Sequence, residues 1–116
     1  MRILIVDDHE VSRAAISALL QTEGFRVADV TTGRAAIAVA MAFRPVVAIV
    51  DVAPDRATGF LIASELQALP GAPAVVLTSS AGRRRFGAKL AQHQFIAKAD
   101  LCGEAITAQL AAQAPP

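Results

Sequence analysis

The sequence predicts one α/β domain in which a parallel sheet carries helices on both faces. Short apolar runs alternate with longer segments of helical periodicity along the chain, as in a doubly wound sheet with right-handed crossovers. The most apolar run, residues 46–50, fits a strand buried on both faces. A chain of 116 residues, 54% of them hydrophobic, suits a single core.

Five strands and five helices are expected. The strands are predicted at 2–7, 25–30, 46–51, 74–78 and 95–97, and the helices at about 10–23, 34–43, 59–69, 84–92 and 103–113. The first, third and fourth strands are the most apolar and should be central, whereas Arg26 and Asp29 mark the second strand as an edge. The predicted strand order is therefore 2-1-3-4-5, as in flavodoxin-like folds.

Apolar spacing also predicts which helical side chains face the sheet. These positions are Val11, Ala15, Ile16, Leu19, Leu20, Ile37, Met41, Ile62, Leu66, Leu69, Ile106 and Leu110. Three signals mark helix ends: Gly24 after the first helix, Thr32 before the second, and Arg44-Pro45 after it.

Composition argues against several classes of protein. A net charge of +1 argues against nucleic-acid binding by bulk charge, and the single cysteine, Cys102, forms neither an intrachain disulfide nor a cysteine metal cluster. The sequence has no membrane-spanning run and no signal peptide at its start. A cytoplasmic protein is expected, with residues 114–116 as a tail or the start of a linker.

Polar groups follow four of the five predicted strands. Asp7 and Asp8 come after the first, Asp51 ends the third, Thr78 ends the fourth and Lys98 follows the fifth. Parallel strands end at one edge of the sheet, which is where ligands bind in open α/β sheets. Two carboxylates ~4 Å apart repel by about 4 kcal/mol, and a divalent cation such as Mg²⁺ removes that cost. A carboxylate beside Mg²⁺ and a lysine is a competent nucleophile toward phosphorus.

This series resembles the receiver domain of two-component response regulators over essentially the whole chain, with residues 1–113 as the domain. The matching positions are Asp7-Asp8, Asp51, Gly59 eight residues further on, Thr78 and Lys98. The resemblance implies that Asp51 accepts a phosphoryl group from a sensor histidine kinase or phosphotransfer protein. It implies a switch domain rather than an enzyme with turnover.

The resemblance also assigns the supporting residues. Asp8 would ligate Mg²⁺ directly, Asp7 directly or through water, and the Ala53 carbonyl would be a further ligand alongside Asp51. Thr78 and Lys98 would bind the phosphoryl group. Phe95 matches an aromatic switch position, whose movement would repack the face formed by the fourth helix, fifth strand and fifth helix. Dimerisation on phosphorylation would use such a change.

Departures from the family pattern cluster around the site. Ala53 stands where many receivers have a polar side chain, and Pro54 lies one residue early. Ala99 replaces a common proline after Lys98, so a trans peptide is expected there. The segment between Thr78 and Lys98 is short for the family, which predicts a truncated or irregular helix at 84–92.

Simpler readings exist for individual residues. Asp7 and Asp8 are also suited to capping the first helix, and Phe95 to plain core packing. His9 is expected to be a solvated loop residue, with metal contact as the alternative, and His93 a surface residue. Residues 83–85 suit a solvated helix start, and Cys102 a half-buried apolar site.

Three competing functions follow from the same residues. One is a receiver-like module that works without phosphorylation. Another is a small phosphohydrolase of the haloacid dehalogenase type, which also uses Asp, Lys and Mg²⁺ but places its nucleophile after the first strand. The third is the receiver part of a longer transcriptional regulator.

Overall fold

The sheet has five parallel strands in the predicted order. A computed structural model describes residues 1–52, 56–80 and 93–113. The strands are β1 (Arg2–Val6), β2 (Arg26–Val30), β3 (Val47–Asp51), β4 (Ala74–Thr78) and β5 (Gln94–Phe95). They pair in the order β2-β1-β3-β4-β5, every pair parallel, which confirms the flavodoxin-like prediction. β2 is half-exposed, as expected of an edge strand.

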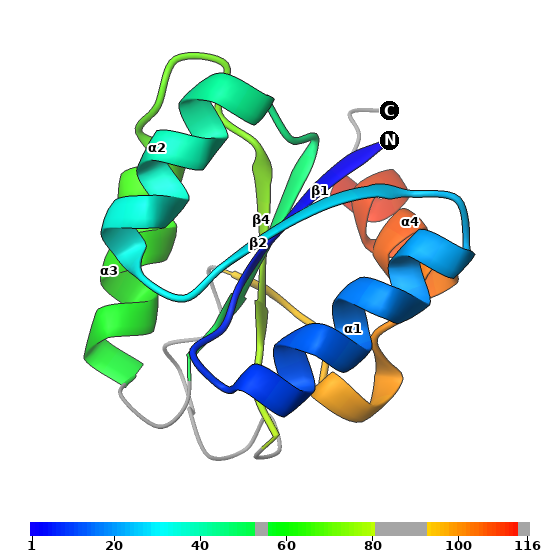
Figure 1. Cartoon of the computed structure of the whole chain (residues 1–116). Helices are drawn as coiled ribbons and strands as arrows, with labels where there is room; N and C mark the ends of the chain where they lie inside the picture. Colours follow the sequence, from blue (N-terminus) through cyan, green and yellow to red (C-terminus); the bar gives the residue numbers. More distant parts are fainter. Residues whose placement is uncertain (53–55, 81–92, 114–116) are drawn as a thin grey trace.

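Helices cover both faces of this sheet. The described helices are α1 (Glu10–Thr22), α2 (Gly33–Phe43), α3 (Arg56–Gln67) and α4 (Gly103–Gln113), with a short 3₁₀ turn, η2 (Lys98–Asp100). Figure 1 shows α2 and α3 on one side of the sheet and α1 and α4 on the other. The helix predicted at 84–92 lies outside the described residues. No helix in the described ranges is both long and apolar enough to cross a bilayer.

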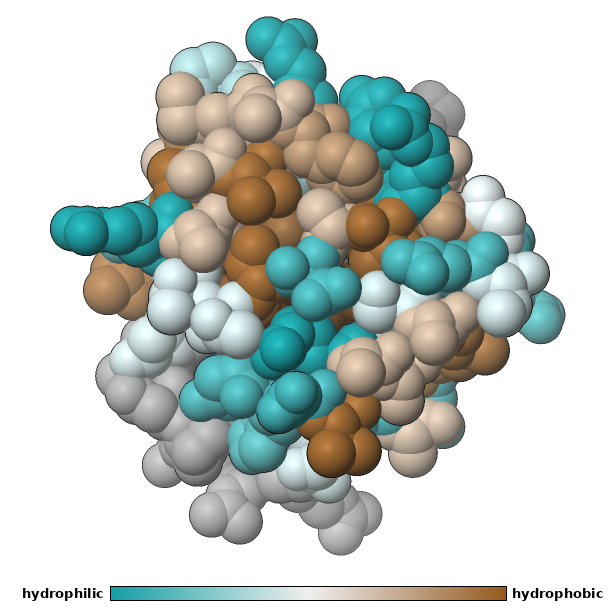
Figure 2. All heavy atoms as spheres, viewed as in Figure 1, coloured by the Kyte–Doolittle hydropathy of each residue, from teal (hydrophilic) through white to brown (hydrophobic). Residues whose placement is uncertain are grey.

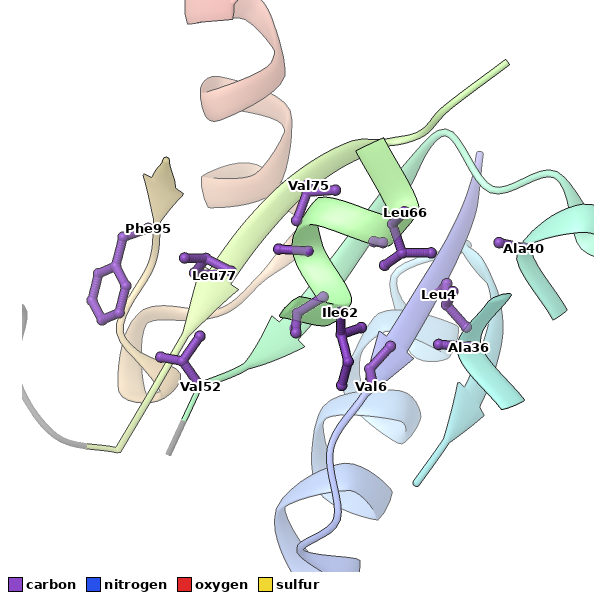
Figure 3. Packing of buried hydrophobic residues seen from close by; sticks show 13 residues of the cluster. Leu4, Val6, Ala36, Ala40, Val52, Ile62, Leu66, Val75, Leu77 and Phe95 are labelled. Atoms are coloured by element: carbon purple, nitrogen blue, oxygen red, sulfur yellow. The ribbon is translucent and has the colours of Figure 1, made fainter. Parts of the chain in front are cut away.

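Alternation along the strands sorts the core into two layers. Leu4, Val50 and Leu77 belong to the layer under α2 and α3, while Ile3, Ile49 and Val76 belong to the layer under α1 and α4. All six side chains are fully buried. Figure 3 shows the first layer, with Phe95 of β5 at its end beside Leu77 of β4. Full burial of each such side chain is worth roughly 1.5–3 kcal/mol, so the central strands form a firm base for the loops at their ends.

Two predicted helix faces are partly wrong. In α1, the predicted Ile16 and Leu20 are buried, together with Ser17. Val11 is 84% exposed, Leu19 is 42% exposed, and Ala15 is exposed as well. The buried stripe is therefore rotated by about one residue from the i, i+4, i+8 series that starts at Val11.

The second helix shows a similar correction. Met41 is 65% exposed, whereas Ala36 and Ala40 are buried. Small alanine side chains allow α2 to lie close to the sheet and to α3, so the larger side chains are displaced outward. The predictions for Ile62, Leu66 and Ile106 are confirmed, since all three are buried.

The predicted helix ends are confirmed. Thr32 caps α2 by accepting a hydrogen bond from the Ala35 N–H at 3.1 Å. Gly24 follows α1 with φ +95°, a conformation in which a Cβ is strained. Arg44 ends α2 in the left-handed region with φ 52°.

Helix α3 begins at Arg56, three residues before the predicted start at Gly59. The helix passes so close to the end of β3 that a Cβ on Gly59 would lie 2.7 Å from the Val52 Cα and 3.0 Å from the Asp51 carbonyl oxygen. Gly59 is therefore a close-approach position within the helix rather than its first residue.

Replacing Gly59 by Ala should lower the free energy of unfolding by about 1–3 kcal/mol, because the new methyl group meets backbone that cannot yield locally. Urea unfolding followed by circular dichroism measures this loss. Gly33→Ala is the matched control, because its Cβ would meet only the Ile62 side chain, at 2.8 Å. An equal or smaller loss for Gly59→Ala than for Gly33→Ala would contradict the close-approach explanation.

Candidate functional site at the carboxyl edge of the sheet

Backbone hydrogen bonds position the site residues at and just after the ends of the strands. Asp51 and Thr78 are direct partners in the β3–β4 register, and the Asp7 N–H donates to the Val30 carbonyl at 3.1 Å. On the other side, the Lys98 N–H donates to the Ser79 carbonyl at 3.1 Å. The residues that follow β1, β3, β4 and β5 are thus fixed at one edge.

Four potential ligand groups cluster there. One ligand atom from each of Asp7, Asp8, His9 and Asp51 lies within 4.8 Å of the others. The Asp7 and Asp51 side chains are buried, 1% and 2% exposed, whereas Asp8 is 65% exposed. In Figure 2 hydrophilic side chains gather below the centre of the face, around the turn from β1 to α1. The cluster therefore has two buried members and an open rim.

An open cleft continues from this cluster toward α2 and α3. Its lining includes Asp8, Asp51, Thr32, Thr58 and Gly59. Polar groups and a close-approach glycine therefore surround the space in front of the carboxylates, and a small anionic group has room beside them.

Asp7 is not a helix cap. The residue at the cap position of α1 is His9, and it makes no capping side-chain hydrogen bond. Oδ1 of Asp7 accepts the His9 N–H at 2.8 Å, and the Asp7 carbonyl accepts from Nη1 of Arg13 at 3.0 Å. These bonds fix both the main chain and the carboxylate of Asp7 at the site.

Lys98 supplies the positive charge. Its Nζ lies 2.9 Å from Oδ2 of Asp7 and 3.2 Å from Oδ2 of Asp51, and the side chain is only 12% exposed. Nζ also donates to the Ser12 hydroxyl at 3.1 Å, which ties it to the first turn of α1. One ammonium group is thus held between the two buried carboxylates.

The electrostatic balance is visible in the pKa of Asp7. Burial raises this pKa, but the Lys98 ammonium and the His9 N–H together lower it by more than burial raises it. The pKa of Asp7 therefore lies below the ordinary value of an aspartate. Asp7 is therefore ionised at neutral pH although its side chain is out of solvent.

The Thr78 hydroxyl is engaged elsewhere. Its Oγ1 is buried and donates to the Ile96 carbonyl at 2.7 Å, across the β4–β5 pair. Phe95, the neighbour of Ile96, is 9% exposed and packs in the layer under α2 and α3. Both candidate switch residues therefore take part in β4–β5 packing.

Sequence reasoning underestimated α1. His9 is not simply a solvated loop residue, since its Nδ1 lies 3.3–3.4 Å from oxygens of Asp7, Asp8 and Asp51. The sequence gives no sign that Ser12 contacts Lys98, and for both residues the only signal is that they lie close to Asp7 and Asp8 in the chain. The Ala53 carbonyl and residues 83–85 lie outside the described residues. Cys102 is half-buried, as expected.

Comparison with known proteins agrees with this geometry. A sequence model described as the response regulator receiver domain matches residues 3–101. The chain belongs to the response regulator receiver family. Among curated protein sequences, none matches the chain significantly.

Solved receiver structures share the fold of this receiver domain. The signal receiver domain of a modulated diguanylate cyclase from Desulfovibrio desulfuricans G20 is 23% identical, with TM-score 0.73 over 96% of this chain and 90% of that one. A CheY-like receiver from Methylobacillus flagellatus is also 23% identical, with TM-score 0.74 over 94% and 98%. Thermotoga maritima TrrA, solved in complex with Mg²⁺ and BeF, is 20% identical, with TM-score 0.75 over 92% and 94%. At these identities the likeness concerns the fold.

Removing the lysine charge should invert the pH dependence of stability. In the wild type, the lowered pKa of Asp7 contributes stability that is present above about pH 4 and is lost as the pH falls through the folded-state pKa. In Lys98→Met the ammonium no longer opposes burial, which has the largest effect on this pKa, and the contacts with His9 and Asp51 oppose it alone, so the pKa of Asp7 should rise above its ordinary value. The variant should lose about 1–3 kcal/mol at neutral pH and recover stability as the pH falls toward about 4.

Urea unfolding in a chelator between about pH 4 and pH 7 measures both effects. Arg26→Met is the matched control, because it removes the same charge from an exposed position on β2. Parallel pH profiles for Lys98→Met and wild type would contradict the assigned balance.

Proposed function

We propose that this receiver domain accepts a phosphoryl group on Asp51 in a Mg²⁺-dependent reaction and acts as a signalling switch. One observation carries the proposal: a buried carboxylate at the end of the central strand β3 has a lysine ammonium 3.2 Å away and two further carboxylates within the same cluster. This arrangement concentrates a nucleophile, a cation and potential metal ligands at one point.

The donor set fits a magnesium ion. Asp7, Asp8 and Asp51 offer carboxylate oxygens, which Mg²⁺ prefers, and the Ala53 carbonyl is the further ligand that the family resemblance implies. When bound, the ion neutralises negative charge on the carboxylates and on an incoming phosphoryl group. The similar T. maritima protein was solved in complex with Mg²⁺ and BeF, which supports Mg²⁺ binding by this receiver.

The transfer step is a displacement at phosphorus. A carboxylate oxygen of Asp51 forms the new P–O bond while the bond from phosphorus to the donor breaks, and the donor leaves with that electron pair. With a phosphohistidine donor the bond that breaks is P–N. Lys98 lies close enough to Asp51 to balance the phosphoryl charge after transfer.

Signal output depends on Thr78 and Phe95 in this proposal. The Thr78 hydroxyl has one proton, which forms the hydrogen bond to the Ile96 carbonyl. To donate a hydrogen bond to a phosphoryl oxygen, the hydroxyl must first break its bond to Ile96. Loss of the bond loosens the β4–β5 edge on which Phe95 packs. The surface around β5 and α4 then changes.

Partners follow from this chemistry. The donor is a sensor histidine kinase or phosphotransfer protein, and phosphorylation promotes a homodimer or a contact with an output domain. The proposed receiver unit is residues 1–113, with 114–116 as tail or linker, in the cytoplasm and without direct contact to nucleic acid or membrane. The domain serves as a phosphoacceptor and does not turn over external substrates.

Incubation with Mg²⁺ and acetyl phosphate tests the function. Intact-mass spectrometry should show a gain of one phosphoryl group in the wild type and none in Asp51→Asn, and chelation of the metal should abolish the gain. Asp100→Asn, at an exposed aspartate in η2, is the matched control and should be phosphorylated normally.

Absence of a gain in folded wild type would favour the phosphate-independent module. Release of inorganic phosphate in many turnovers from small esters would favour the phosphohydrolase instead. The position of Asp51 on β3 rather than β1 argues against that enzyme class.

The Ile96 carbonyl reports on the switch. Adding Mg²⁺ and beryllofluoride, which mimics a phosphoryl group, should move the ¹³C resonance of this carbonyl in the direction of a lost hydrogen bond in wild type and in Thr78→Ser. In Thr78→Val the carbonyl has already lost its donor, so the change should be much smaller. An unmoved Ile96 resonance in loaded wild type would refute the exchange of partners by Thr78.

A further inference from the structure

His9 extends the acidic cluster with a nitrogen. Its Nδ1 lies 3.4 Å from Oδ1 of Asp7, 3.3 Å from Oδ1 of Asp8 and 3.4 Å from Oδ2 of Asp51. The ring is half-exposed at the rim, while Asp7 and Asp51 form the buried wall. An imidazole directed to solvent would not approach three separate carboxylates at nearly equal distances.

These distances correspond to the edges of a small coordination polyhedron. Four ligands about 2.0–2.1 Å from a zinc ion are separated by about 3.3–3.4 Å in a tetrahedron. The three nitrogen–oxygen separations already have this length. The four atoms together span up to 4.8 Å, as expected of carboxylates that repel one another before an ion draws them in.

Both oxygens of the buried Asp7 carboxylate are held at this wall. Oδ2 is paired with Nζ of Lys98 at 2.9 Å and accepts no hydrogen bond from the other described residues. Oδ1, the oxygen beside Nδ1 of His9, accepts the His9 N–H at 2.8 Å. His9 therefore supplies both the backbone group that anchors this carboxylate and the ring nitrogen that faces it.

We propose that His9 Nδ1 is a fourth metal ligand and that the site binds a divalent transition ion of the Zn²⁺ class through one nitrogen and three carboxylates. Magnesium favours oxygen donors and near-octahedral geometry, whereas imidazole suits zinc and its neighbours. The inference rests on the metal site of the proposed function but assigns it a second kind of ion.

Such an ion would compete with the phosphoryl reaction. Asp51 provides one of the four ligand atoms through Oδ2, the oxygen that also faces Lys98. An ion held by all four groups therefore ties up the nucleophile, so zinc should inhibit Mg²⁺-dependent phosphoryl uptake. The availability of transition metal would then set the fraction of receiver that can respond.

Nitrogen-15 NMR of the wild type tests the ligand directly. The chain contains two histidines, so His93 serves as the internal reference in the same sample. Titration with Zn²⁺ alone at mildly alkaline pH should shift the Nδ1 resonance of His9 strongly and leave the His93 ring nitrogens unchanged. Binding of zinc with no shift at Nδ1 of His9, or with a shift at His93 alone, would overturn the proposal.

Affinity measurements against a chromophoric chelator give the second readout. His9→Gln should weaken Zn²⁺ binding by about tenfold or more and change Mg²⁺ binding by less than about threefold, because only zinc depends on the nitrogen. His93→Gln is the matched control and should leave both affinities unchanged. Comparing each metal between variants removes the general preference of proteins for zinc over magnesium.

Equal losses of zinc and magnesium affinity in His9→Gln would overturn the assignment, because they indicate general damage to the site. Unchanged zinc affinity in Asp51→Asn would place the ion elsewhere and would also overturn it. Neither readout uses phosphoryl transfer. Zinc binding through His9 without phosphoryl uptake would refute only the proposed function. Phosphoryl uptake without zinc binding through His9 would refute only this inference.

Discussion

Two buried carboxylates share one ammonium group at the edge of the sheet, and the site depends on that arrangement. Asp7 and Asp51 are each almost fully removed from solvent, and Lys98 lies within 3.2 Å of both. A buried charge without a partner costs several kcal/mol, so neither carboxylate is tolerable in this place alone. The ammonium compensates part of the repulsion, and a bound cation compensates more. The domain therefore carries a built-in affinity for positive charge at the place where the phosphoryl group is proposed to arrive.

The stability of the sheet compensates for this concentration of charge. Its central strands bury large aliphatic side chains on both faces, and parallel pairing continues past the last strand residues through the Val52–Thr78 and Lys98–Ser79 backbone hydrogen bonds. Helix α1 contributes as well, because Arg13 holds the Asp7 carbonyl and Ser12 holds the Lys98 ammonium. The site is thus positioned by two layers of structure, the strand ends and the first turn of a helix.

Most of the fold and the acidic site could be predicted because they depend on features that are local in the sequence. An apolar run followed by Asp51 or Lys98 marks a strand end, and parallel topology brings such ends together. Helix faces were harder. Val11 fits an apolar stripe but is exposed, and Met41 is displaced by Ala36 and Ala40, because the burial of a stripe depends on how closely its neighbours pack. His9 was underestimated since its ring position follows from the turn in which Asp7 accepts the His9 N–H, a contact that periodicity does not encode.

The hydrogen bond from Thr78 to Ile96 also has a thermodynamic consequence. Under the proposed switch, the same hydroxyl proton serves either the Ile96 carbonyl or the phosphoryl group, so the two contacts are mutually exclusive. Linkage is reciprocal: whatever strengthens the Thr78–Ile96 contact weakens phosphoryl retention by the same factor, and whatever weakens it prolongs retention at equilibrium. A protein that binds only the outer face of β5 would therefore regulate the occupancy of Asp51 without touching it. In this sense the downstream partner is also an effector of the phosphorylation that recruits it.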